Sequence, residues 1–268
     1  GSSYLRIVYS THYHDGLISM IDINGESKET FNVIGIKPTF SPDGKKILYY
    51  TKEGEIHIMN RDGSENKKLT DSNLNQHEPI FSPDGTKIIY SENRANGLSD
   101  IWIMNVDGSN KQQLTDTEDY KEVLARISPD GTKIVFLREY LDGQGSTDIF
   151  IMNIDGSNQT ALVNGFDYIP DNICITPDGS KIIFYKREKI ENQQIYNIFS
   201  MKLDGSEKTN LTGNTNEKVT ITYPTLNKDG TKIVYIYVDG AADYAADLYV
   251  MDADGSNQTK LTNATNSS

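Results

Sequence analysis

The chain has 268 residues, of which 36% are hydrophobic and 24% charged, a composition typical of a globular protein. Its net charge of −12 disfavours nucleic-acid binding, because a phosphate backbone is held by clustered cations. No run of about 18 apolar residues is present, so we expect no insertion into a membrane. Cys174 is the single cysteine, which excludes a disulfide within the chain.

From its N-terminus, the chain first predicts three strands, at Tyr4–Ser10, Ile18–Ile23 and Glu26–Asn32. A short motif then begins to recur, and its second copy, Ser82–Tyr90, reads Ser-Pro-Asp-Gly-Thr-Lys-Ile-Ile-Tyr. The aspartates of its five copies stand 41 to 51 residues apart, at Asp43, Asp84, Asp130, Asp178 and Asp229. A period of this size indicates an architecture of repeated supersecondary units.

Each of the five full units predicts four strands, which we call a, b, c and d. Strand a is a short apolar segment before the Asp-Gly motif, and strand b follows the motif directly. Strand c ends in a second Asp-Gly turn, and strand d ends at Leu-Thr or, in one unit, at Leu162-Val163. The c strands are Ile56–Asn60, Ile101–Asn105, Ile149–Asn153, Ile198–Lys202 and Leu248–Asp252. No segment has the apolar periodicity of a helix.

Both turns predict the same geometry, a type I turn closed by a glycine with positive φ. Such a turn joins two antiparallel strands in a tight hairpin, and glycine adopts it freely because it has no Cβ. We therefore expect Gly85→Val to destabilise the protein far more than Gly97→Val, since Gly97 lies in a long variable loop.

A four-stranded antiparallel sheet cannot bury both faces alone, whereas radially stacked sheets cover one another. Six units therefore predict an all-β fold, a six-bladed β-propeller of four-stranded antiparallel blades in a single domain over residues 1–268. The first blade either has three strands or is completed by residues outside this chain. The units cover about residues 4–32, 36–70, 77–115, 123–163, 171–212 and 222–262, followed by a polar tail at 263–268.

The pattern Ser-Pro-Asp-Gly…Ile-x-Tyr…Asp-Ile-Trp-Ile-Met-Asn-x-Asp-Gly-Ser…Leu-Thr resembles PD40, the WD40-like repeat of TolB propellers. The resemblance covers nearly the whole chain, without the α/β domain that precedes the propeller in TolB. It implies a place in the bacterial cell envelope, whether periplasmic, cell-surface or secreted. Prolyl oligopeptidase propellers look similar too, but no Gly-x-Ser-x-Gly nucleophile elbow is present.

Loop lengths distinguish the two ends of each blade. The b–c and d–a connections vary, so that the interval from strand-b aromatic to second-turn glycine runs from 14 residues (Tyr49 to Gly63) to 21 (Phe184 to Gly205). In an up-and-down blade these connections share one end, which we call the loop end. The opposite end carries both Asp-Gly turns, and we call it the turn end. Length variation confined to one end usually marks the binding surface.

Aromatic and basic residues near the loop end are candidate anchors for a partner, because Tyr and Arg are enriched at interface hot spots. The candidate binding residues are His77, Arg94, Tyr120, Arg138, Tyr168 and Tyr223. We expect no catalytic residue among the acids that precede strand c, such as Asp100. They recur from unit to unit, which favours local hydrogen bonds to backbone amides.

His12, His14 and His77 could together bind a metal. Oligogalacturonate lyases, which carry related propellers, have a His-based metal site. However, His12 and His14 stand two apart on a loop and no motif fixes the third ligand. We therefore expect surface histidines, no metal and no other cofactor.

These observations favour a non-enzymatic module, monomeric, that binds a protein or peptide, or a glycan, through the loop end and the channel mouth. The alternative is a polysaccharide-active enzyme, a lyase or glycosidase, with its site at the channel mouth. An enzyme needs converging acid, base or metal groups there, whereas a binding module needs an exposed aromatic or apolar patch.

Overall fold

The computed structural model describes residues 6–11, 16–22, 27–71, 73–140, 147–166, 172–240 and 246–262. The regular structure of these ranges consists of 23 β-strands, with no helix among them. It follows that no helix in the described ranges could cross a membrane. Contacts divide the chain into two compact units, residues 1–125 and 126–268.

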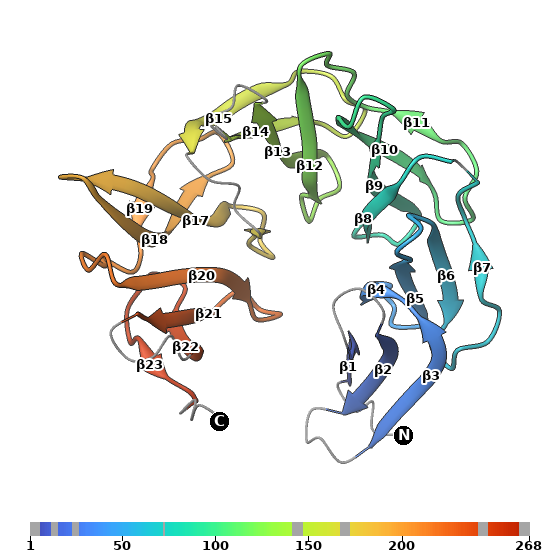
Figure 1. Ribbon diagram of the computed structural model, residues 1–268, viewed down its shortest axis with the longest axis horizontal. Coiled ribbons are helices and arrows are strands. Elements are labelled where there is room, and N and C mark those ends of the chain that lie inside the picture. Colours follow the sequence, from blue (N-terminus) through green and yellow to red (C-terminus); the bar gives the residue numbers. More distant parts are fainter. Residues whose placement is uncertain are drawn as a thin grey trace. The chain divides into compact units, whose positions relative to one another are not determined.

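The first unit contains three antiparallel sheets that follow one another along the chain, drawn from blue to green in Figure 1. The first sheet has three strands and the next two have four each. The strands are β1 (Arg6–Ser10), β2 (Leu17–Asp22) and β3 (Lys28–Ile34); β4 (Ile36–Phe40), β5 (Lys46–Tyr50), β6 (Ile56–Asn60) and β7 (Lys67–Lys68); β8 (Gln76–Phe81), β9 (Lys87–Asn93), β10 (Ser99–Asn105) and β11 (Gln112–Gln113).

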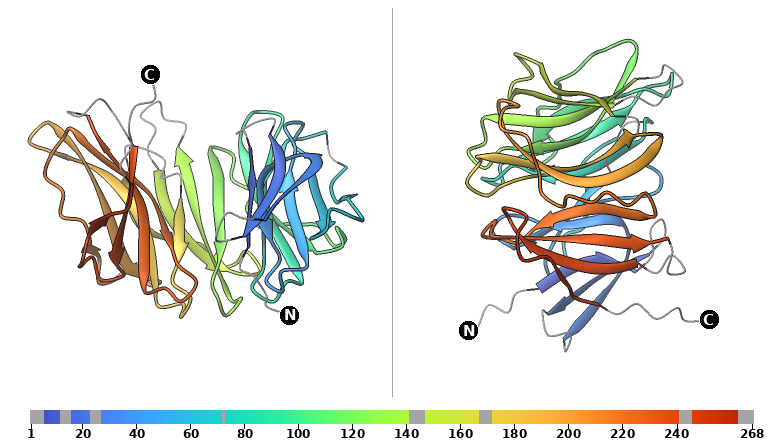
Figure 2. Two further views of the ribbon diagram at one scale, coloured as in Figure 1. Left: turned by 90° about the horizontal axis from the view of Figure 1, so that it is seen from below. Right: turned by 90° about the vertical axis from the view of Figure 1, so that its left-hand side faces the viewer.

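The second unit contains three four-stranded antiparallel sheets, and Figure 2 shows the last two stacked on one another. The strands are β12 (Tyr120–Ile127), which starts at the end of the first unit, β13 (Lys133–Tyr140), β14 (Thr147–Asn153) and β15 (Thr160–Phe166); β16 (Ile173–Ile175), β17 (Lys181–Ile190), β18 (Gln193–Lys202) and β19 (Thr209–Asn210); β20 (Val219–Leu226), β21 (Lys232–Asp239), β22 (Ala246–Asp252) and β23 (Thr259–Lys260).

The six sheets are the predicted blades, numbered 1 to 6 in chain order, and in each the strands neighbour one another in sequence order. The prediction of an all-β, six-bladed propeller is confirmed, with a three-stranded first blade in the described residues. Strand-b aromatics such as Tyr49 and Tyr90 are only 1% exposed. They lie in apolar clusters that join neighbouring sheets, where burying each large side chain contributes roughly 1.5–3 kcal/mol.

The first turn of each full blade has the predicted geometry. In blade 2, the amide of Gly44 donates to the carbonyl of Ser41 over 2.8 Å, and the Ser41 hydroxyl donates to Asp43 over 2.7 Å. Glycine φ values at the five turns lie between 70° and 73°. Hydrogen bonds from the serine and from backbone N–H groups lower the pKa of the turn aspartate, so it is ionised at neutral pH.

The second turn adds a packing requirement to the left-handed backbone. A Cβ on Gly108 would stand 2.9 Å from the carbonyl oxygen of Leu69, on the preceding blade. A Cβ on Gly255 would clash with the same atom of Leu211. Glycine at this turn is therefore required by contact between neighbouring blades as well as by turn geometry.

The expected contrast between Gly85 and Gly97 is wrong in its premise. Gly97 also has a positive φ, at 82°, against 72° for Gly85. The b–c loop of blade 3 closes in its own tight turn, in which the Gly97 amide donates to the carbonyl of Arg94 over 3.0 Å. A valine would be strained at both positions.

Candidate functional site

Several predicted loop residues lie on strands, because strand a is longer than its apolar segment indicated. His77 lies within β8, Tyr120 begins β12 and Tyr223 lies within β20. In three of these a strands a residue with positive φ interrupts the alternation, namely Glu78, Leu124 and Tyr223. Such β-bulges interrupt the alternation of apolar and polar residues by which a strand is predicted from sequence. Tyr168, like His12 and His14, lies outside the described residues.

Arg94 is held by carboxylates at the loop end of blade 3. Its guanidinium forms a bidentate ion pair with Asp100, which is buried, and lies 2.9 Å from Asp116. The hydrogen bond with Asp100 raises the pKa of Arg94. Gln113 also donates to Asp100 over 2.9 Å. Arg94 therefore orders its loop and has little capacity left to anchor a partner.

A second carboxyl group, that of Glu92, lies beside this ion pair. Glu92 pairs with Asp100 across β9 and β10, and the amide of Gln76 donates to it over 2.8 Å. Burial raises the pKa of Glu92, and the nearby Asp100 adds to the effect. Gln76 is fully buried, and its own carbonyl oxygen has no hydrogen-bond partner among the described residues. Glu92 and Asp100 thus form a pair of neighbouring carboxyl groups, one of them with a raised pKa, as in the acid–base pairs of enzymes.

His77 occupies the neighbouring position on β8 and is largely buried. Its ring lies 3.1 Å from the side-chain oxygen of Asn93, and burial lowers its pKa. The adjacent Glu78 bonds to blade 2 through Lys37 over 2.6 Å, and to the amide of Leu124 over 3.2 Å. His77 and Arg94 thus each contact polar side chains of blade 3, which hold them in place within the first unit.

Arg138 has a comparable structural setting in the second unit. Its guanidinium stacks 4.0 Å from the ring centre of Phe150 and donates to Gln159 over 2.8 Å. On the same strand, the Tyr140 hydroxyl donates to Asp148 over 2.6 Å. The acids at the start of strand c thus bond chiefly to side chains, which corrects the expectation of backbone amides. The corresponding amide in blade 3, that of Ile101, instead donates to Thr115 over 2.9 Å.

Tyr223 differs from the other predicted residues in its exposure. Its side chain is 46% exposed, and its φ of 53° places it at the strand-a bulge of blade 6. Nearer the loop end, Tyr196 and Tyr237 pack half-buried against one apolar cluster shared by blades 5 and 6. The sequence indicated Tyr223 as a candidate, but not that Tyr196 and Tyr237 would pack against one cluster shared by the same two blades.

The long b–c segment of blade 5 is a hairpin extension. Strands β17 and β18 have ten residues each, and a two-residue turn of positive φ, Glu191-Asn192, joins them. Ile190, beside this turn, is 50% exposed. Blades 5 and 6 of the second unit therefore carry apolar and aromatic side chains at and near the loop end. We call the four residues Ile190, Tyr196, Tyr223 and Tyr237 the tyrosine surface.

No group of three His, Cys, Asp or Glu in the described part of the chain could hold a metal ion. The three-histidine hypothesis depends on His12 and His14, which are not described, so it stays a hypothesis. We therefore derive no chemistry through a metal.

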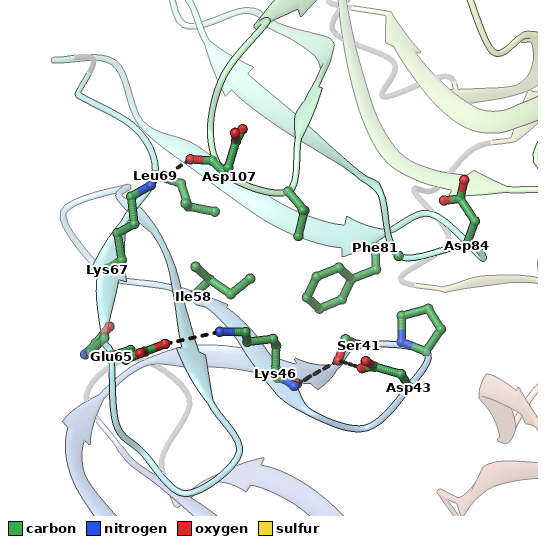
Figure 3. Close-up of a pocket in the computed structure, with 14 residues that line it drawn as sticks. Ser41, Asp43, Lys46, Ile58, Glu65, Lys67, Leu69, Phe81, Asp84 and Asp107 are labelled. Carbon is green, nitrogen blue, oxygen red and sulfur yellow. Dashed lines mark hydrogen bonds and ion pairs between the residues drawn. The ribbon is translucent and has the colours of Figure 1, made fainter.

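A pocket at the turn end of the first unit was not predicted (Figure 3). It has a volume of about 750 Å³ and lies between blades 2 and 3, where Ile58, Leu69 and Phe81 surround its centre. A smaller pocket of about 310 Å³ occupies the equivalent place between blades 5 and 6. Repeat patterns cannot indicate such pockets, because their walls come from side chains on different blades.

Comparison with solved structures finds propellers of several kinds. A protein assigned as TolB from Agrobacterium tumefaciens has a TM-score of 0.70 at 22% identity, covering 93% of this chain and 89% of its own. TolB from Acinetobacter baumannii has a TM-score of 0.68 at 22% identity, covering 94% of this chain and 62% of its own. An oligogalacturonate lyase in complex with manganese has a TM-score of 0.68 at 12% identity, covering 98% and 74%.

These identities are low enough that the likenesses show the fold alone. No curated protein sequence matches the chain. The family model of the TolB beta propeller domain, PD40, matches residues 6–220, which include all the blades of the first unit and two of the second. The chain belongs to the TolB beta propeller domain family.

Proposed function

We propose that this chain is a non-enzymatic interaction module of the bacterial cell envelope that binds a protein or peptide partner. The tyrosine surface of blades 5 and 6 carries the proposal. Tyr223 and Ile190 are about half exposed, at 46% and 50%. The other exposed large hydrophobic residues of the described chain lie in blades 1 and 6: Ile7, Leu17, Ile34, Leu248 and Leu261. Exposed aromatic and apolar side chains are typical of protein-binding surfaces.

Two further features support a binding role. Tyr196 and Tyr237 rest on a buried cluster, so they would lose little conformational freedom when a partner covers them. Membership of the TolB propeller family supports the envelope location. A glycan, the other ligand class that the sequence suggested, could stack on the same tyrosines.

The proposal is tested by capture of partners from an envelope extract of the producing bacterium. One variant combines Tyr223→Ser with Ile190→Ser, and a control carries Lys228→Ser, an exposed change at the turn end. We expect the wild type and the control to crosslink to the same protein, and the double variant to lose at least about 90% of that product. Equal capture by the double variant contradicts the proposal.

A second candidate function, a polysaccharide-active enzyme, is favoured by the pairing of Glu92 with Asp100. A carboxyl group with a raised pKa beside a second carboxylate is the arrangement that glycosidases use. The fold of the oligogalacturonate lyases is also similar. Incubation with oligogalacturonate should then release new reducing ends, which both hydrolysis and elimination produce, and Glu92→Gln should abolish their release. No product from the wild type would count against this candidate.

A further inference from the structure

The turn-end pocket of the first unit has an apolar centre built from two blades. Ile58 on β6 and the nearby Leu69 are 8% and 4% exposed, while Phe81 on β8 and Val106 pack half-buried against the same cluster. Figure 3 shows Ile58 and Phe81 facing one another across the cavity. At about 750 Å³, the pocket lies within the range of roughly 300–1,000 Å³ that is typical of ligand sites.

The residues of this apolar centre differ from those at the same positions of blades 5 and 6. In blades 5 and 6, Ser200 stands at the sequence position of Ile58, Leu226 at that of Phe81 and Ala253 at that of Val106. Of these three, only Ala253 lines the smaller pocket. The turns that frame both pockets are the same, so turn geometry alone does not create the larger cavity. The apolar lining comes from Ile58, Leu69, Phe81 and Val106. The same four positions are also apolar between blades 4 and 5, where they are Ile151, Leu162, Ile175 and Leu203.

Acidic groups dominate the rim. Four carboxylates line the pocket, those of Asp43, Glu65, Asp84 and Asp107, against the two ammonium groups of Lys46 and Lys67. Lys46 lies 3.5 Å from Glu65, and Lys67 donates to the backbone carbonyl of Asp107 over 2.8 Å.

Asp43 and Asp84 stand on the a–b turns of the two blades. Hydrogen bonds from Ser41 and Ser82 and from backbone amides lower the pKa of these carboxyl groups. Both are therefore ionised at neutral pH, and both are exposed. The chain as a whole, at −12, adds to the negative potential.

We propose that this pocket binds a peptide segment of a partner protein in which one large apolar side chain is flanked by arginine or lysine. The apolar side chain would fill the space between Ile58, Leu69 and Phe81. The flanking cations would face Asp43 and Asp84. Complementary charge favours this occupant over a second copy of the acidic chain, because two copies repel one another. The surface is distinct from the tyrosine surface of the second unit.

The test uses fluorescein-labelled pentapeptides and the whole chain, followed by fluorescence anisotropy. The probe has the core Arg-Trp-Arg, and the controls have Glu-Trp-Glu, which reverses the charge, and Arg-Ser-Arg, which removes the apolar group. We expect the probe to bind at least about tenfold more tightly than either control. Added salt should weaken its binding, because ion pairs at an exposed rim are screened.

Two variants locate the bound probe. Ile58→Ser, which introduces the residue found at the same position of blade 5, should weaken binding about tenfold. Asp43→Asn combined with Asp84→Asn should weaken it about fivefold and reduce its salt dependence. The matched control, Asp178→Asn with Asp229→Asn, changes the equivalent turns of blades 5 and 6 and should leave affinity within about twofold.

Each contrary result overturns the proposal. If the Arg-Trp-Arg probe does not bind, the pocket is not a site for such a peptide. If Glu-Trp-Glu binds equally well, the acidic rim does not select flanking cations. Equal weakening by the Asp178 and Asp229 pair places the probe elsewhere. A dimer that Ile58→Ser dissociates assigns the pocket to a second copy of the chain. If circular dichroism shows that Ile58→Ser does not fold, Val106→Ala, with the residue of blade 6, tests the same apolar contact.

Discussion

Some residues of this fold are required for the backbone conformation that they adopt rather than for side-chain chemistry. The second-turn glycines combine a positive φ with contact to the preceding blade, as at Gly108 against Leu69. The sequence predicted the conformation from the Asp-Gly pair. It could not predict the contact, because Leu69 belongs to another repeat.

A comparison of Gly108 with Gly97 distinguishes the effect of positive φ from the effect of contact with the preceding blade. Both have positive φ, at 88° and 82°, but a Cβ on Gly97 would meet nothing within 4 Å. We expect Gly97→Ala to cost about 1–2 kcal/mol of unfolding free energy, for the left-handed backbone alone. Gly108→Ala should cost roughly 1–3 kcal/mol more, because the Leu69 carbonyl must move. Urea denaturation measures both, and equal losses would contradict the inter-blade contact.

His77 predicts a pH dependence of stability. Burial lowers its pKa from 6.5, so the folded state binds fewer protons than the unfolded state below that value. Its contribution to stability is therefore present above about pH 6.5 and is lost as the pH falls toward the folded pKa.

We expect the unfolding free energy of the wild type to fall more between about pH 7 and pH 5 than that of His77→Gln. Urea denaturation of both proteins at the two pH values gives the comparison. Carboxyl groups titrate in both proteins, so their effect cancels in the difference. Parallel pH profiles would show that His77 does not contribute.

At the scale of the blade, a threonine hydroxyl marks where strand d ends. Thr115 accepts from the amide of Ile101 over 2.9 Å, and the pattern recurs in blades 2, 5 and 6. In blade 4, where Val163 stands at this position, strand β15 has seven residues, whereas the d strands of the other full blades have two. The hydroxyl thus takes the place of a backbone ladder bond.

Thr115→Val should therefore destabilise blade 3. Thr115 is 2% exposed, so the substitution leaves the Ile101 amide buried without its acceptor, at a cost of about 1–3 kcal/mol. Thr115→Ser retains the hydroxyl and should recover most of the loss. Chemical denaturation of the two variants measures the difference, and equal stability of Val and Ser would argue against a role for the hydrogen bond.

The bulge in strand a explains which parts of the site the sequence could indicate. Tyr223 was recognised by its residue type, but its half-exposed position depends on a left-handed backbone that a non-glycine residue rarely adopts. Arg94 was also recognised, yet its partner Asp100 makes it structural. Residue type indicates whether a side chain is suited to bind a partner. The neighbouring side chains determine whether it is exposed or already paired within the protein.

For the molecule as a whole, charge is the property most directly linked to stability. A net charge of −12 repels itself in the compact state. We expect the Tm at about pH 7 to rise by roughly 2–4 °C as sodium chloride is raised from about 10 mM to about 300 mM. Near the isoelectric point, about 4.8, the same series should produce little change. A melting series by circular dichroism checks this, and an equal rise at both pH values would contradict it.

The sequence by itself determined the number of blades, their strand order and their turns, because each depends on residues close together in the chain. The joining of the two units in a single domain, and a monomeric state, stay predictions. Only the tertiary structure decided the rest: that Arg94 is held by buried Asp100, that Tyr223 is exposed at a bulge, and that blades 2 and 3 enclose an acidic-rimmed apolar pocket. These features arise from contacts between side chains on different strands and blades. The repeat pattern of the sequence does not specify which of these side chains will be in contact.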